Sequence, residues 1–213
     1  MPEAEAAYVV QAYEAARVIL EYGSGGTTRL AARMPGKRVF TVESDFDWAR
    51  NLRREIEADE RTAALTTIHH VDIGPTGRWG RPTDVTCWRR FHRYPLDIWE
   101  APFFRQPDVV LIDGRLRTAC LAAVMLLATQ PVRVLFDHYA MRPSYKKMEN
   151  LVRPKRMIGR LAEFELVPGT VRREDMPQLI AQFSTMSFDG ITESFYSEPC
   201  TAVESRGISG AKG

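Results

Sequence analysis

Blocks of apolar and polar residues follow one another along this chain, and they predict strands and helices in turn. Short apolar runs of strand length and composition lie at residues 18–21, 38–43, 65–73, 107–113, 132–136, 162–168 and 179–184. Helical patterns lie between them, at residues 8–16, after residue 43, at residues 119–128 and after Pro143 and Ser144. Such alternation is typical of a doubly wound α/β fold, with a mostly parallel sheet and helices on both faces.

The helix expected after residue 43 is amphipathic. Phe46, Ala49, Leu52 and Ile56 recur at helical spacing and are predicted to be buried. The apolar pattern at residues 119–128 is too short to span a bilayer, and we interpret it as a core helix that packs on the sheet.

The length of the chain favours one domain. A chain of 213 residues can bury a core of ordinary size but is short for two ordinary domains. We expect a single domain over residues 1–197 and a disordered tail over residues 198–213, which are rich in glycine, serine and small residues.

A glycine-rich turn follows the first predicted strand. Glu21 ends the apolar run, and glycines at positions 23, 25 and 26 would allow positive φ and close approach of a ligand. Glu43 ends the next strand about 20 residues later, where nucleotide-binding folds place a carboxylate for ribose hydroxyls. The glycine-rich turn and Glu43 together predict an adenosine-containing cofactor. The alternative is that Glu43 ends an exposed strand before a helix capped by Ser44.

The same residues bear on which cofactor is bound. The dinucleotide fingerprint needs a small residue where this chain has Thr28, and Glu21 suits a positively charged amino-acid group better than a pyrophosphate. Here the chain resembles the class I S-adenosylmethionine-dependent methyltransferases, whose first motif is an apolar strand, an acid, one residue and then G-x-G. The resemblance covers roughly residues 15–140.

The resemblance implies a seven-stranded sheet closed by an antiparallel hairpin, for which residues 162–168 and 179–184 are the candidates. It implies that Asp72 binds the adenine amine while Ile73 packs on the ring, and that Asp113 faces the same edge as Glu21 and Glu43. The cofactor-binding residues expected on this basis are Glu21, Gly23, Ser24, Gly25, Glu43, Ser44, Asp72, Ile73 and Asp113.

Candidate catalytic groups follow the fourth and fifth predicted strands. The segment 112–115 lacks the Pro-Pro-aromatic pattern of methyltransferases that act on DNA bases, and it looks more like that of small-molecule O-methyltransferases. Within that group, the catechol type binds magnesium through residues that correspond to Asp113, Asp137 and His138. Histidine is an unusual ligand for magnesium, so a general-base role and a structural role for His138 remain as alternatives.

Residues 74–106 are too long for an ordinary crossover between parallel strands. They leave the cofactor side of the predicted sheet and carry eight aromatic or histidine side chains among arginines: Trp79, Trp88, Phe91, His92, Tyr94, Trp99, Phe103 and Phe104. A lid or acceptor pocket would use such residues, and so would a satellite core or a contact between copies in a homo-oligomer.

Charge and cysteine content bear on the partners and the cellular compartment of the protein. The net charge of +2 does not call for nucleic acid or an anionic membrane. The three cysteines have no metal-ligand spacing, and the amino terminus carries acids rather than the basic residues of a secretory signal, so we expect a cytoplasmic protein.

The sequence therefore predicts an S-adenosylmethionine-dependent methyltransferase that acts on an oxygen of a small-molecule acceptor. Two alternatives stay open. One is a nicotinamide-dependent oxidoreductase, and the other is a non-catalytic methyltransferase-like binding module.

Overall fold

The structure of this protein is a computed structural model, and it describes residues 1–186. The predicted tail at residues 198–213 and Cys200 lie outside these residues. None of the helices among residues 1–186 is both long and apolar enough to cross a membrane.

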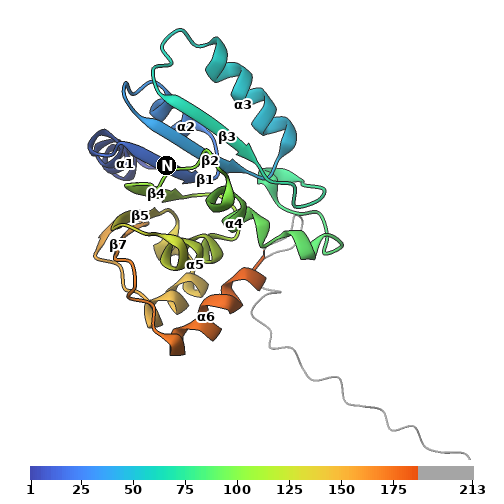
Figure 1. The fold of residues 1–213 in the computed structure, drawn as a ribbon, viewed down its shortest axis with the longest axis vertical. Coiled ribbons are helices and arrows are strands. Elements are labelled where there is room, and N and C mark those ends of the chain that lie inside the picture. The colour runs from blue at the N-terminus through green and yellow to red at the C-terminus, as the bar shows by residue number, and fades with distance from the viewer. Residues whose placement is uncertain (187–213) are drawn as a thin grey trace, which may run out of the picture.

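Seven strands form one sheet, in the order β3-β2-β1-β4-β5-β7-β6. The strands are β1 (Val18–Tyr22), β2 (Arg38–Glu43), β3 (Leu65–His70), β4 (Val109–Ile112), β5 (Val132–Phe136), β6 (Arg156–Ile158) and β7 (Leu161–Leu166). The first five pair in parallel, whereas β7 is antiparallel to both β5 and β6. The doubly wound, mostly parallel sheet with an antiparallel end is thus confirmed (Figure 1).

Helices cover both faces of this sheet. The α-helices are α1 (Glu3–Ala15), α2 (Gly26–Ala32), α3 (Phe46–Ala58), α4 (Arg93–Glu100), α5 (Arg117–Leu127) and α6 (Met176–Ala181). Short 3₁₀ helices lie at Arg78–Gly80, Trp88–Arg90, Tyr139–Met141, Pro143–Asn150, Arg173–Asp175 and Gln182–Ser184. One apolar cluster joins α1 to the sheet, a smaller one joins α3, and the largest joins α4 and α5 to the opposite face.

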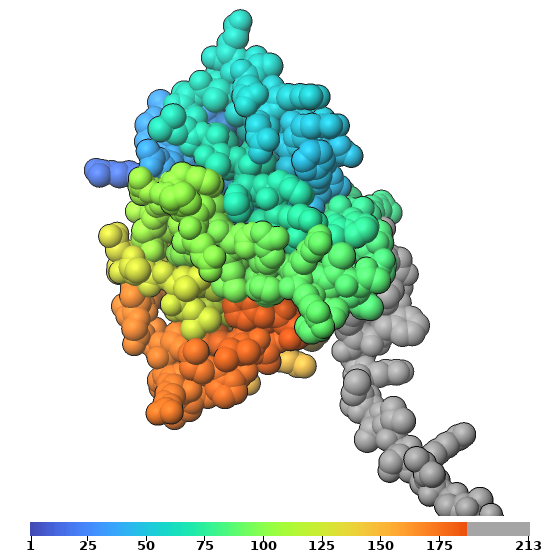
Figure 2. Space-filling model, turned by 45° about the vertical axis from the view of Figure 1, so that its right-hand side comes forward, coloured from blue at the N-terminus to red at the C-terminus, as the bar shows by residue number. Residues whose placement is uncertain are grey.

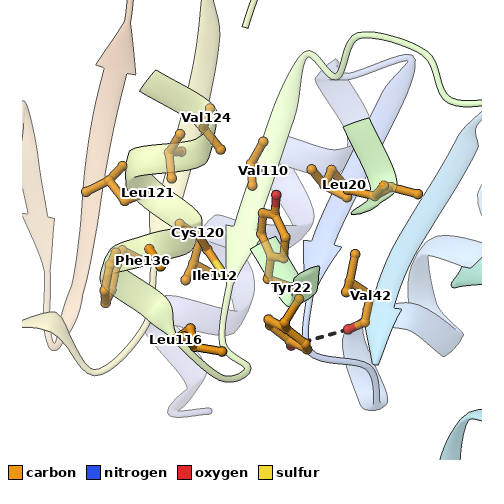
Figure 3. Packing of buried hydrophobic residues seen from close by; sticks show 14 of the residues in the cluster. Leu20, Tyr22, Val42, Val110, Ile112, Leu116, Cys120, Leu121, Val124 and Phe136 are labelled. Atoms are coloured by element: carbon orange, nitrogen blue, oxygen red, sulfur yellow. Dashed lines mark hydrogen bonds between the residues drawn. The ribbon is translucent and has the colours of Figure 1, made fainter. Parts of the chain in front are cut away.

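Strand β1 shows how the two faces are separated. Because side chains alternate along a strand, Ile19 and Glu21 lie on the side of α1, and Leu20 and Tyr22 lie on the side of α5. Helix α5 buries Leu121 and Val124 against the second face, as Figure 3 shows. The central strands are therefore buried on both sides, as expected for a parallel sheet between two helical layers.

The predicted hairpin is right in one strand and wrong in the other. Residues 162–168 correspond to β7, but its hairpin partner is β6, and residues 179–184 form the end of α6 and a 3₁₀ turn. Pro177 in the first turn favours a helix there, because its fixed φ and missing N–H are compatible with that position. Strand β6 has only three residues, none of them fully buried, so its apolar pattern is weak.

Helix α3 departs from the prediction at its start. Ala49, Leu52 and Ile56 are buried, whereas Phe46 is 58% exposed and stacks edge-on against His70. The side chain of Asp45, not that of Ser44, caps the helix by accepting a hydrogen bond from the Trp48 N–H. Glu43 is buried, so it does not end an exposed strand.

The long segment at residues 74–106 has two parts. Its second half is helix α4, which contributes Tyr94 and Ile98 to the largest core cluster and packs on α5. Its first half carries the exposed side chains of Trp79 and Trp88. In Figure 2 this green segment lies on the surface between the blue amino-terminal half and the orange region of α6.

Candidate functional site

The glycine-rich turn lies between β1 and α2. Gly23 has φ of +98°, and a Cβ there would come within 2.6 Å of the Gly114 Cα, so the loops after β1 and β4 touch through their glycines. Gly25 has extended backbone and Gly26 begins α2, so the expected positive φ is found only at Gly23. A Cβ at Gly25 or Gly26 would meet no atom, which leaves open space beside this turn.

Glu21 lies beneath the turn rather than on its surface. Its fully buried carboxylate accepts hydrogen bonds from the Tyr13 hydroxyl and the Thr28 hydroxyl, both at 2.6 Å. Burial raises the pKa of Glu21. The Thr28 hydroxyl also accepts from the Gly25 N–H at 2.9 Å, so Glu21 and Thr28 together hold the turn in place.

Glu43 lies beside the same turn, at the end of β2. One of its oxygens accepts from the Ser24 hydroxyl at 2.7 Å and from the Ser24 N–H at 3.3 Å. The other accepts from the backbone N–H groups of Ser44 and Asp45, at 2.7 and 3.0 Å. The carboxylate is thereby fixed next to the open space at Gly25. The Ser44 hydroxyl donates to the Gly80 carbonyl, so the loop after β3 contacts this edge.

The two residues expected at the adenine ring have different environments. The Asp72 side chain is 56% exposed and forms an ion pair of 2.7 Å with Arg90. Ile73 is fully buried and belongs to the largest core cluster. In this structure Asp72 is accessible to a ligand, whereas Ile73 supports the loop from inside the core.

The structure brings together Asp113, Asp137 and His138. Their ligating atoms all lie within 4.8 Å of one another, at the carboxyl ends of β4 and β5. The His138 Nδ1 lies 3.0 Å from a carboxylate oxygen of Asp137 and 3.7 Å from one of Asp113. Asp137 is completely buried, whereas the His138 side chain is 30% exposed.

Two arginines balance the charge of this cluster. Arg160 binds the Asp137 carboxylate with two hydrogen bonds of 2.9 Å, and Arg117 pairs with Asp113 at 2.9 Å. Burial raises the pKa of Asp113, and the charge of Asp137 acts in the same direction. Burial alone would also raise the pKa of Asp137, but the bonds from Arg160 and from the His138 N–H lower it.

The donor set does not fit a resident magnesium ion. Both oxygens of Asp137 already accept hydrogen bonds, and two guanidinium groups neutralise the two carboxylates. Magnesium also requires near-octahedral oxygen ligation, and His138 offers nitrogen. A divalent ion would have to displace Arg160 and approach two positive charges.

His138 is held in an unusual conformation. Its φ of +61° lies in the left-handed region, which costs a non-glycine residue on the order of 1 kcal/mol. Its N–H donates to Asp137 at 2.8 Å, and that bond maintains the turn. Burial lowers the pKa of His138, and the charges of Arg117 and Arg160 act in the same direction, so the imidazole is neutral near pH 7.

Comparison with known proteins identifies the family. No family model and no curated protein matches the chain. A solved structure of a methyltransferase-like protein from Silicibacter pomeroyi is 44% identical, with a TM-score of 0.81, and covers 87% of this chain and 96% of that one. The chain belongs to the class I S-adenosylmethionine-dependent methyltransferases.

More distant similarities concern other methyltransferases. An RNA methyltransferase from Salinibacter ruber, solved with S-adenosyl-L-homocysteine, is 18% identical, with 81% and 96% coverage and a TM-score of 0.46. A predicted O-methyltransferase from Agrobacterium tumefaciens is 11% identical, with 86% and 99% coverage and a TM-score of 0.45. Membership of the methyltransferase family sets aside the nicotinamide-dependent oxidoreductase.

Sequence reasoning missed three residues that organise this methyltransferase site. Arg117 donates to the carbonyls of Asp113, Gly114 and Asp137 and so ties together the loops after β4 and β5. Arg160 and Tyr13 hold the two buried carboxylates. One signal was present, because a cation in the first turn of a helix is disfavoured by the helix dipole, and Arg117 begins α5.

Proposed function

We propose that this methyltransferase binds S-adenosylmethionine beside the turn at Gly25 and methylates a hydroxyl oxygen of a small molecule, with His138 as the general base. The observation that carries the proposal is the Asp137–His138 pair at the carboxyl edge of the sheet, which also holds Ser24 and Glu43. In open α/β sheets, ligands bind at that edge.

The residues around the turn suit the cofactor. Glu43 has a fixed carboxylate for the ribose hydroxyls, and Gly25 leaves space for the rest of the molecule. Asp72 would accept a hydrogen bond from the adenine amine. Bound S-adenosylmethionine supplies an electrophilic methyl group, and the protein has to align the acceptor oxygen with it.

His138 would remove the acceptor's proton. This role requires the imidazole proton on Nδ1, which lies 3.0 Å from an Asp137 carboxylate oxygen and 3.2 Å from the Arg117 Nη1. Nε2 is then free to take the hydroxyl proton as the oxygen attacks the methyl carbon. The Asp137 charge stabilises the imidazolium that forms, and Arg160 keeps Asp137 ionised.

Calorimetry tests the cofactor assignment. Purified protein should bind S-adenosylmethionine and S-adenosylhomocysteine but not NAD. Glu43→Ala should weaken binding at least about tenfold, because charge-assisted bonds to the ribose are worth about 1.5–3 kcal/mol. Glu57→Ala, on the exposed face of α3, is the matched control and should leave the affinity for S-adenosylmethionine unchanged. Unchanged affinity in folded Glu43→Ala protein would reject the assignment.

A chelator experiment distinguishes general-base catalysis by His138 from metal-dependent catalysis. Release of S-adenosylhomocysteine with a panel of hydroxylated acceptors should continue in excess chelator and fall with His138→Gln. Since neutral His138 is the active form and its pKa is lowered, the wild-type rate should rise with pH with a midpoint below the ordinary histidine value, and His138→Gln should lose that rise. Cofactor binding with no turnover on the panel would favour a non-catalytic binding module instead.

We also propose a cytoplasmic location. Cys87 and Cys120 are both free thiols, and a reducing compartment preserves them.

A further inference from the structure

Two arginines near the candidate site have unused hydrogen-bond donors. Arg81 follows the 3₁₀ turn after β3, and Arg115 follows Gly114 at the end of β4. The Nε of each guanidinium is buried and has no hydrogen-bond partner. Among residues 1–186, neither side chain forms an ion pair with a carboxylate. Buried donors without partners are costly, and they are common where a ligand supplies the acceptor.

The surroundings of Arg115 contain surplus positive charge. Burial lowers the pKa of Arg115, and the charges of Arg117 and Arg81 act in the same direction. The groups that oppose this shift are the phenols of Tyr94 and Tyr145, and neither is a carboxylate. Arg117 is already paired with Asp113, so within the described part of the chain no carboxylate balances the charges of Arg81 and Arg115.

We propose that Arg81 and Arg115 bind a carboxylate or phosphate group on the methyl acceptor. This inference rests on the proposed function, and it narrows the acceptor to a small hydroxylated acid. A guanidinium matches both anions in geometry and forms paired, charge-assisted hydrogen bonds with them. The anion would satisfy the buried Nε atoms and balance the surplus charge.

The placement of Arg115 favours the acceptor over the cofactor as the source of the anion. Arg115 is close to Arg117 and Tyr145, after β4 and β5, and also to Tyr94 and Arg81 from the segment 74–106. Arg117 also lies 3.2 Å from the His138 Nδ1. An acid held at Arg115 therefore lies on the side of the proposed base. Arg81 lies at the Glu43 edge, because the Ser44 hydroxyl donates to the carbonyl of the preceding residue, Gly80. An anion held by both arginines would therefore lie between the proposed cofactor site and the proposed base.

Nuclear magnetic resonance of the arginine Nε–H groups tests this site directly. The wild-type protein, saturated with S-adenosylhomocysteine, is titrated with 4-hydroxybenzoate, with inorganic phosphate and with the uncharged control 4-hydroxybenzamide. We expect the Nε–H signals of Arg81 and Arg115 to shift saturably with the two anions and not with the amide. Absence of a saturable shift at millimolar concentrations of both anions would overturn the proposal.

Variants of Arg115 test whether this residue binds the anion. Arg115→Met should weaken anion binding, followed at the Arg81 signal, by about tenfold or more, and Arg115→Lys should weaken it less. Arg54→Met, at an exposed position on α3, is the control. Because Arg115→Met removes a guanidinium whose buried Nε has no partner, the melting temperature of this variant without ligand should not fall. A clear fall would make Arg115 a structural residue and contradict the proposal.

Cofactor binding by the same variants distinguishes a wrong assignment of the anion from a failure of the proposed function. Arg115→Met should bind S-adenosylhomocysteine as the wild type does. If it loses this affinity but keeps that for methylthioadenosine, which lacks the amino-acid group, the arginines hold the cofactor's carboxylate and the acceptor assignment is wrong. If the wild type does not bind S-adenosylhomocysteine, the proposed function fails, whereas the anion titration, repeated without it, still reports on the arginines.

Discussion

Arg160→Met should destabilise the protein strongly, because it leaves the Asp137 carboxylate buried without its counterion. Asp137 is completely buried, and Arg160 supplies two of its hydrogen bonds. Breaking a buried ion pair typically costs about 3–5 kcal/mol. The Arg160 side chain is 23% exposed, so we expect the lower end, about 3 kcal/mol. For a domain of this size that corresponds to a fall in melting temperature of roughly 6–12 °C.

A double variant separates the lost pair from lost packing. In Asp137→Asn/Arg160→Met position 137 carries no charge, so the free energy of unfolding should recover by at least about 1 kcal/mol relative to Arg160→Met. Arg153→Met, at a nearby exposed position, should have no effect. Urea unfolding measures all four proteins. Equal losses in the single and double variants would refute the argument from the buried charge.

The effect of Arg160→Met should depend on pH in a defined direction. The folded state lowers the pKa of Asp137, so the pair stabilises the protein above the unfolded pKa of about 3.9 and ceases to do so as pH falls through the folded value. Without Arg160, burial raises the Asp137 pKa in the variant, so the difference between wild type and variant should be largest at high pH. It should shrink as pH falls from the raised pKa of Asp137 in the variant towards its lowered pKa in the wild type. Loss of the Arg160 charge should also raise the pKa of His138, which a histidine titration by magnetic resonance measures.

Two further predictions concern the turn after β1. Gly25→Val should keep a native circular dichroism spectrum, because the backbone at Gly25 is extended. It should lose S-adenosylhomocysteine binding by calorimetry, because the valine side chain would occupy the open space expected for the ligand. Retained binding would point to another site. Tyr13→Phe should lower the free energy of unfolding by about 1.5–3 kcal/mol in a urea titration, because the buried Glu21 carboxylate loses one of its two hydroxyl donors; a loss below about 0.5 kcal/mol would show that this donor is dispensable.

The parallel part of the sheet was predictable because each strand carries its own evidence. β1, β2 and β4 are apolar runs buried on both faces, and each has an acid at or next to its carboxyl end. From that topology alone, Asp113, Asp137 and His138 could be expected to meet, and the structure brings them together. Strand β6 was not predictable, since its three residues are stabilised by pairing with β7 rather than by a buried face.

The direction of individual side chains was harder to predict than the position of strands. Glu21 and Glu43 both lie near strand ends, yet Glu21 bonds inward to Tyr13 and Thr28, whereas Glu43 lies beside Ser24. Tyr13 and Glu21 meet only because α1 packs across β1. Arg160 is likewise remote in sequence from Asp137, so no local spacing could have indicated the pair.

The hydrogen-bond network around His138 extends to helix α1. This connection explains why Glu5, which is not part of the site, is buried. Glu5 of α1 is buried, and its carboxylate accepts from the Arg160 N–H at 3.1 Å. A Cβ at Gly159 would lie only 2.2 Å from the Glu5 carboxylate, so the β6–β7 turn fits closely against α1. That contact fixes the backbone of Arg160, whose side chain then fixes Asp137. The orientation of His138 therefore depends on α1 as well as on the strands that carry it.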